Sequence, residues 1–230
     1  MKNNLTELVF ILDRSGSMSG LEKDTIGGFN SMLEKQKKEE GQAIITTVLF
    51  DNKYELLHDR INIKGISPIT EKEYYVRGTT ALLDAVGRTI EKIENAHKHT
   101  LEAERPSKVL FVITTDGMEN SSTRYNYEKI KRMIEDKKKE FGWEFIFLGA
   151  NIDAVKAAES IGISEDRATN YNCDSEGTKL NYEVISETVS SIRANKAINK
   201  NWKDKIDKDY YKSEANNWHK FAEEVKSKFL

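Results

Sequence analysis

Three short segments of this 230-residue chain carry oxygen-bearing side chains of the kind that bind hard cations. The first is Asp-Arg-Ser-Gly-Ser at 13–17, the second is Thr-Thr at 79–80, and the third is Thr-Asp-Gly at 115–117. Together they offer two carboxylates and several hydroxyls, with neither histidine nor cysteine. Hard oxygen donors of this type suit Mg²⁺, Mn²⁺ or Ca²⁺ better than zinc or copper. The chemistry that these residues predict is therefore the binding of a divalent cation.

The elements predicted around these segments place them at one edge of a sheet. An apolar run at 5–12 predicts a buried strand that ends where the first segment begins. The β-branched and aromatic run at 108–117 predicts a central parallel strand, and residues 79–80 come just before an amphipathic helix. Ligand sites of parallel sheets lie outside the carboxyl ends of the strands. Alternate side chains of a tight loop also point the same way, so the carboxylate and the two serines of the first segment can converge on one ion.

Strands alternate with helices along the rest of the chain. The sequence therefore predicts an α/β fold with a doubly wound, mainly parallel six-stranded sheet. A hairpin joined at Asp51-Asn52 predicts one antiparallel edge strand. The predicted strands are 5–12, 43–51, 53–62, 108–117, 143–151 and 168–171, and the predicted helices before the last are 21–40, 82–93, 127–140, 153–161 and 175–194.

The stretch after residue 195 differs in composition from what precedes it. It is rich in lysine and polar until a final helix, for which we predict an N-cap at Ser213. We therefore divide the chain into a domain at 1–195 and a C-terminal helical extension at 196–230. The apolar stripe of the last helix is more typical of docking on its own domain than of a partner site, and without such docking it is a candidate oligomer contact. The stripe consists of Trp218, Phe221, Ala222, Val225 and Phe229.

The overall composition argues against several classes of function. The chain has 36 Lys and Arg residues against 38 Asp and Glu residues, a formal net charge of −2, so we expect binding to neither nucleic acid nor an anionic membrane. No apolar run approaches the roughly 18 residues of a spanning helix, and the first residues show no signal-peptide pattern. Cys173 is the only cysteine, so we expect neither an intramolecular disulfide nor a cysteine-based zinc site. These features favour a cytoplasmic protein.

Three longer stretches around the same segments resemble the signatures of a known family. They are LVFILDRSGSMSG at 8–20, RGTTALLDAVG at 77–87 and VLFVITTDGMEN at 109–120. In this order they resemble the three signatures of the von Willebrand factor A domain, and the resemblance covers about residues 5–195. It implies a Rossmann-like fold with a metal-ion-dependent adhesion site. A further stretch, GWEFIFLGANIDAVKAAESIGI at 142–163, resembles uncharacterised bacterial and phage members, which implies an intracellular type.

The resemblance also implies a role for each residue of the site. It implies that Ser15 and Ser17 bind the metal directly, and that Asp13 and Asp116 lie beside it, largely through water. Thr80 would ligate directly or through water. Thr80 is preferred to Thr79 because Thr-Ala-Leu-Leu-Asp-Ala aligns best with the family's Gly-Thr-Ala-Leu-x-Asp-Ala form.

The function that these residues favour is a binding module rather than an enzyme. A bound Mg²⁺, or Mn²⁺ or Ca²⁺, would accept an Asp or Glu carboxylate from a partner protein. One alternative is a Mg²⁺-dependent phosphoester hydrolase that uses Asp13 and Asp116, although Ser15 stands where a haloacid-dehalogenase-type phosphatase carries its second aspartate. Another is a structural or assembly component with a vestigial metal site. The oligomeric state is left open.

Overall fold

The computed structural model describes residues 4–228, with side chains as far as Asn216 and that of Trp218. Within these residues a single sheet has the strand order β3-β2-β1-β4-β5-β6. All neighbouring pairs are parallel except β2 and β3, which are antiparallel. The predicted α/β fold with a mainly parallel six-stranded sheet and one antiparallel edge strand is therefore confirmed. The strands are β1 (Leu5–Asp13), β2 (Gln42–Phe50), β3 (Tyr54–Asn62), β4 (Lys108–Thr115), β5 (Glu144–Gly149) and β6 (Ala168–Asn170).

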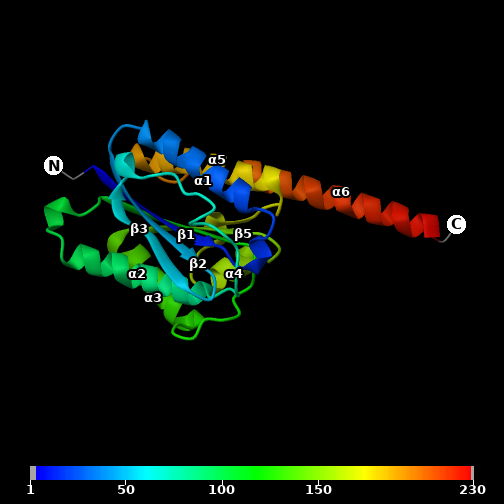
Figure 1. Ribbon diagram of the computed structural model, residues 1–230, viewed down its shortest axis with the longest axis horizontal. Helices are drawn as coiled ribbons and strands as arrows, with labels where there is room; N and C mark the ends of the chain where they lie inside the picture. Colours follow the sequence, from blue (N-terminus) through cyan, green and yellow to red (C-terminus); the bar gives the residue numbers. More distant parts are fainter. Residues whose placement is uncertain (1–3, 229–230) are drawn as a thin grey trace.

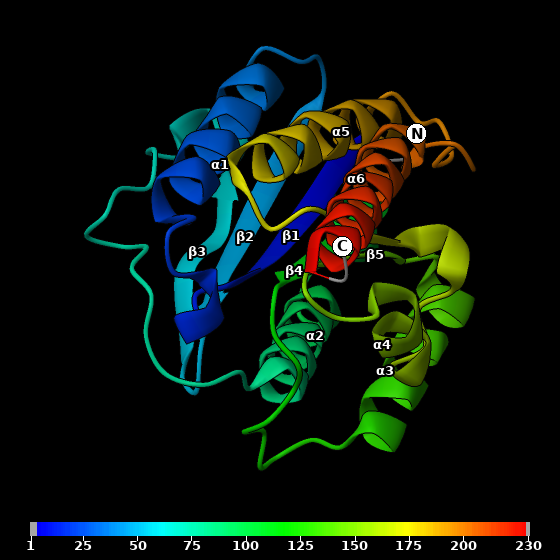
Figure 2. The same cartoon turned by 90° about the vertical axis from the view of Figure 1, so that its right-hand side faces the viewer.

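Helices cover both faces of the sheet (Figure 2). One face carries α1 and α5, and the other carries α2, α3 and α4. The bounds of the first five helices agree with the predicted ones to within five residues, whereas the start of α6 does not. The helices are α1 (Glu22–Lys37), α2 (Leu82–Lys98), α3 (Tyr127–Phe141), α4 (Ala154–Ser160), α5 (Ser175–Arg193) and α6 (Asp204–Lys228).

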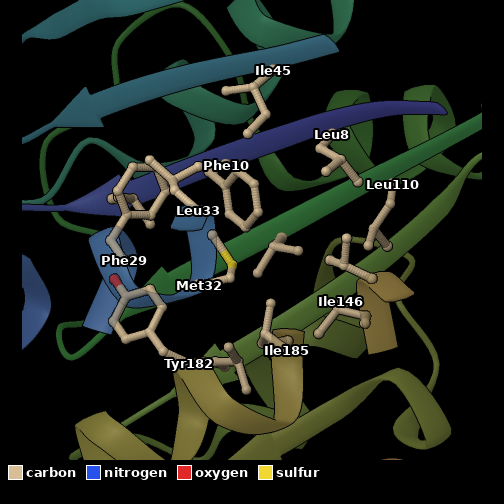
Figure 3. Close-up of a cluster of buried hydrophobic side chains, with 14 of the residues drawn as sticks. Leu8, Phe10, Phe29, Met32, Leu33, Ile45, Leu110, Ile146, Tyr182 and Ile185 are labelled. Carbon is tan, nitrogen blue, oxygen red and sulfur yellow. The ribbon is translucent and has the colours of Figure 1, made fainter. Parts of the chain in front are cut away.

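Strand β1 supplies both hydrophobic cores because its apolar side chains alternate between the two faces. Leu8, Phe10 and Leu12 pack under α1 and α5, whereas Val9 and Ile11 pack under α2 and α3. Figure 3 shows the first of these cores, where Phe10 meets side chains of α1 and α5. A strand buried on both faces can have near-continuous apolar sequence, which is why 5–12 reads as one run.

Helices α1 and α5 approach closely at a glycine. A Cβ added to Gly28 would lie 2.2 Å from Cδ2 of Tyr182, so any side chain at this position would displace that ring. The Tyr182 ring in turn packs edge-on against Phe29, with the ring centroids 6.3 Å apart. Gly28 is therefore needed for the packing of one helix on the other, despite its unfavourable helix propensity.

The last helix begins ten residues earlier than predicted. α6 starts at Asp204, so Ser213 lies inside the helix and the predicted N-cap is wrong. The acidic residues Asp204 and Asp207 occupy its first turn, where they interact favourably with the helix dipole. The segment has few apolar residues, so hydrophobic periodicity gave no sign of this first part.

The start of the extension packs on the domain, and the helix then projects away from it (Figure 1). Ile198, Trp202 and Ile206 belong to the core under α1 and α5. Trp218 is 69% exposed, so at this residue the expected docking of the stripe on its own domain is wrong. The side chains of the other four stripe residues lie outside the described residues. The division of the chain at residue 195 stays a prediction. Among the described residues, none of the helices combines the length and apolar character needed to cross a membrane.

Candidate metal site

The first predicted segment folds around the carboxylate of Asp13. Asp13 is the last residue of β1 and is 1% exposed. Its Oδ1 accepts a hydrogen bond from the backbone N of Ser15 (2.7 Å), and its Oδ2 accepts one from Oγ1 of Thr115 (2.6 Å), the last residue of β4. Asp13 therefore fixes the loop that carries the two serines and ties it to the neighbouring strand.

The hydroxyls of the three segments meet in one cluster at this edge of the sheet. Oγ of Ser15 lies 3.1 Å from Oγ of Ser17, and Oγ1 of Thr80 donates to Oγ of Ser15 (3.1 Å). Ser17 donates to Oδ1 of Asp116 (2.6 Å). The structure thus brings all five predicted site residues together, and their role as metal ligands stays a prediction. Thr80 is buried in the cluster, whereas Thr79 is exposed outside it.

Gly117 lies directly against these hydroxyls. A Cβ at Gly117 would lie 3.0 Å from Oγ1 of Thr80, 3.1 Å from Oγ of Ser17 and 3.9 Å from Oγ of Ser15. A larger residue at this position would therefore crowd the hydroxyls of Thr80 and Ser17. Among the side chains that the structure describes, no group of three or more His, Cys, Asp or Glu residues is placed to hold a metal. A cation at this edge has to use the hydroxyls, a donor set that fits a hard ion such as Mg²⁺.

The two carboxylates of the cluster carry charge that the surrounding residues do not balance. Burial raises the pKa of Asp13 to about 6, although hydrogen bonds from Thr115 and Ser15 act in the opposite direction. Burial also raises the pKa of Asp116, against a hydrogen bond from Ser17. Neither carboxylate forms an ion pair with any described residue. A divalent cation would supply the missing positive charge, so the electrostatics of the cluster fit a metal as well as its donor atoms do.

A buried arginine that the sequence analysis did not single out holds the second segment in place. Arg14 is fully buried, and its side chain bonds to residues at the end of β2 and the start of β3. Its Nε lies 3.0 Å from Oδ2 of Asp51, and its Nη2 lies 2.6 Å from Oε2 of Glu55. Arg77 reaches the same Asp51 Oδ2 at 2.7 Å.

Backbone bonds complete this anchor. The N–H of Arg77 donates to the carbonyl of Arg14 (2.9 Å), and that of Ala81 donates to the carbonyl of Asp51 (2.9 Å). The segment between them contains Thr80. The position of Arg14 between two candidate ligands indicates that it could matter to the site, but a single sequence does not reveal which residues it pairs with.

The third segment is joined to the second by a pair of hydrogen bonds. The N–H of Thr80 donates to Oδ1 of Asn120 (2.9 Å), and the N–H of Asn120 donates to the carbonyl of Thr80 (3.0 Å). Glu119 accepts from the backbone N of Leu83 (2.9 Å), at the start of α2. Sγ of Cys173 lies 3.9 Å from Oδ2 of Asp116, so the single cysteine borders the site without being one of the predicted ligands.

Serines, a threonine and two aspartates thus cluster at the carboxyl edge of an α/β sheet. No protein-family model and no curated protein matches this sequence. Solved structures do match it. A von Willebrand factor type A structure from Catenulispora acidiphila aligns over 83% of this chain and 43% of its own, with a TM-score of 0.55 and 15% identity.

Two further structures have the same fold. Proximal thread matrix protein 1 from the mussel byssus, described with a zinc-occupied MIDAS motif, covers 83% of this chain and 47% of its own (TM-score 0.54, 15% identity). The ArnB paralog VWA2 from Sulfolobus acidocaldarius covers 81% and 45% (TM-score 0.50, 20% identity). The present chain thus spans less than half the length of these three proteins. It has the von Willebrand factor type A fold, as its motifs imply.

Proposed function

We propose that this chain is a metal-dependent protein-binding module. The observation that carries the proposal is the cluster itself, in which Oγ of Ser15 lies 3.1 Å from the hydroxyls of both Ser17 and Thr80. A divalent cation held there supplies a Lewis-acidic position for an Asp or Glu carboxylate of a partner protein. Mg²⁺ is the first choice, with Mn²⁺ and Ca²⁺ next, and the zinc of the byssus protein adds Zn²⁺ to the ions to be tested.

Each residue of the cluster has a separate task in this proposal. Ser15 and Ser17 bind through neutral oxygens, and Thr80 adds a third, so the direct ligands contribute no charge. Asp13 and Asp116 lie behind them, and two carboxylates only balance the charge of a dication. A further acidic oxygen from outside is therefore attracted rather than repelled. Affinity also requires contacts around the metal, because one coordinated carboxylate is a small contact.

The arrangement gives less support to a phosphoester hydrolase. Such chemistry requires a general acid or base within hydrogen-bond reach of the reacting group. Among the described residues, the titratable side chains that contact the cluster are the two aspartates, Cys173 and the buried Tyr74, whose hydroxyl already donates to the backbone carbonyl of Asp13. Within the described side chains, the histidines lie elsewhere, His58 on β3 and His97 and His99 at the end of α2.

The metal is tested first by titration. We expect Mg²⁺, Mn²⁺, Ca²⁺ or Zn²⁺ to raise the melting temperature of the chain, and the rise to disappear in Asp116→Asn. Asp136→Asn, an exposed carboxylate on α3, is the matched control and should keep the full effect. An equal rise in Asp116→Asn would contradict the assignment of the site.

The partner is tested by affinity capture from host lysate on the immobilised chain, with Mg²⁺ and again with EDTA. A protein that is retained only with Mg²⁺ and lost with Asp116→Asn would support the proposal. Retention that is the same under all conditions would overturn it. A turnover assay with p-nitrophenyl phosphate checks the hydrolase, and metal-dependent turnover lost with Asp116→Asn would favour that alternative.

A further inference from the structure

A groove opens directly beside the metal site. It has a volume of about 400 Å³ and lies between the loop after β4, the first turn of α3 and helix α4. Its apolar lining comes mainly from Leu82, Met118, Tyr127, Ile152 and Ala157. Such a volume lies at the low end of pockets that hold organic ligands, so it suits one large side chain better than an extended molecule.

The groove and the metal site share a wall. Gly117 lines the groove, and the same residue lies against the hydroxyls of Thr80 and Ser17. Leu82, which also lines the groove, is two residues beyond Thr80 on the segment that carries it. A peptide with one side chain at the metal would therefore have its neighbouring residues over the groove.

The apolar side chains at the rim are unusually open to solvent. Met118 is 74% exposed and Tyr127 is 46% exposed, in a chain of which 32% of the residues are charged. Exposed apolar groups that gather at a concave site mark an interaction surface more often than scattered ones do.

The charged side chains that line the groove differ in whether they already have hydrogen-bond partners. Glu119 accepts hydrogen bonds from the backbone N of Ser121 and of Ser122 (2.9 and 2.7 Å) as well as from Leu83. Asp153 caps α4 by accepting from the backbone N of Lys156 (3.0 Å). The exposed ammonium of Lys156 itself forms no ion pair with the described residues, so it is free to meet an acidic group of a partner.

We propose that this groove binds a large apolar side chain that lies two residues from the metal-bound carboxylate in an extended, acidic segment of a partner protein. This inference rests on the proposed function. In an extended segment, residues two apart point to the same side and are about 7 Å apart. One side chain then reaches the metal, the next but one enters the groove beyond Gly117, and a further acidic residue faces Lys156. The recognised pattern is Asp or Glu, any residue, then a large apolar residue, in either chain direction.

The test is selection from a displayed library of random twelve-residue peptides. The full chain is immobilised with Mg²⁺, and bound clones are eluted with EDTA. We expect the selected peptides to share an acidic residue with Phe, Leu, Ile or Met two positions away. One selected peptide is then synthesised, with a second version in which Ala replaces the apolar residue.

Two groove variants locate the contact. Tyr127→Ala removes part of the lining, and Ser160→Trp fills the groove from an exposed position on α4. Each variant should lower the affinity for the peptide at least about fivefold, a typical effect of losing an anchoring contact. The control Tyr211→Ala, at a 68% exposed tyrosine of α6, should change affinity less than about twofold. Replacing the apolar residue of the peptide by Ala should reduce affinity less for Tyr127→Ala than for the unchanged chain, because Tyr127→Ala has already removed the contact between the two side chains.

The outcomes separate the two proposals. Acidic peptides with no apolar preference, or peptides bound equally by the groove variants, would overturn the groove and leave the metal site standing. Absence of EDTA-eluted clones would overturn both. Self-association of the chain that is lost with Tyr127→Ala would assign the groove to a second copy and would likewise overturn the inference. Mg²⁺ affinity measured on each variant distinguishes loss of the groove from loss of the metal.

Discussion

Two buried carboxylates on the same strand have opposite surroundings. Glu7 and Asp13 lie on β1 and are 0% and 1% exposed. The carboxylate of Glu7 lies 2.7 Å from Nε of Arg60 and 2.6 Å from Nε2 of His97. Asp13 accepts hydrogen bonds from Thr115 and Ser15, and none of the described residues forms an ion pair with it. Burying a carboxylate is unfavourable unless it is paired.

The difference separates a structural charge from a functional one. Glu7 lies near the amino end of β1, and the guanidinium of Arg60 compensates its charge. Asp13 lies at the carboxyl end, where the protein leaves its charge and that of Asp116 without a cationic side chain. A protein tolerates uncompensated negative charge when a bound ligand neutralises it, and a divalent cation fits that role here.

Removing Glu7 should affect stability most. Glu7→Ala leaves the half-buried Arg60 without its partner, and we expect the free energy of unfolding to fall by about 3 kcal/mol. Denaturant unfolding with and without Mg²⁺ measures the effect, which should be the same in both. The control is Asp59→Ala, which removes a half-exposed carboxylate 2.7 Å from Nζ of Lys92 and should cost less than about 1 kcal/mol. If Glu7→Ala costs no more than its control, Glu7 is not a structural charge.

Replacing Asp13 should raise the unfolding free energy of the metal-free protein, whereas replacing Glu7 lowers it. Its pKa is about 6 in the folded chain against 3.8 in the unfolded one, so at pH 7 its ionised form opposes folding. Asp13→Asn removes that charge but weakens its hydrogen bonds. We expect the metal-free protein to gain about 1–2 kcal/mol in unfolding free energy. The same variant should lose Mg²⁺ binding by calorimetric titration. A destabilised metal-free variant would show that Asp13 is retained for folding rather than for the metal.

The pH dependence of metal binding follows from the same group. Protons and the cation compete for Asp13, because a raised pKa keeps the carboxyl partly neutral near pH 6. Mg²⁺ affinity should fall about tenfold between pH 7 and pH 5 for one group with this pKa. The stability of the metal-free protein depends on pH in the opposite direction. The folded state binds more protons than the unfolded state between pH 4 and 6, so stability should decrease as the pH rises through that range. Melting temperatures with Mg²⁺ or EDTA at four pH values measure both effects, and equal metal stabilisation at pH 5 and 7 would contradict the competition.

The sequence predicted most of the fold because the fold depends on strong local patterns. The apolar runs of β1 and β4 are long enough to identify strands, and the hydroxyl and carboxylate residues at their ends indicate the site edge. Residues that depend on partners distant in sequence were not predictable. Arg14 meets Asp51 across 37 residues, and His97 meets Glu7 across 90, and neither pairing leaves a local pattern. The early start of α6 was missed for a related reason, since its first turns are stabilised by packing of Ile206 rather than by periodicity.

The smallest expected effect is at Gly117, and it tests the geometry of the site rather than its charge. Gly117→Ala places a methyl group 3.0 Å from Oγ1 of Thr80 and 3.1 Å from Oγ of Ser17, so these hydroxyls have to move by a few tenths of an ångström. Neither carboxylate is changed. We expect unfolding free energy without metal to change by less than about 0.5 kcal/mol, as for a substitution with little burial, and Mg²⁺ affinity to fall several-fold. Gly65→Ala, where an added Cβ meets nothing within 4 Å, is the matched control. Unchanged affinity in Gly117→Ala would mean that the cation does not lie among the three hydroxyls, and the charge deficit at Asp13 would then need another explanation.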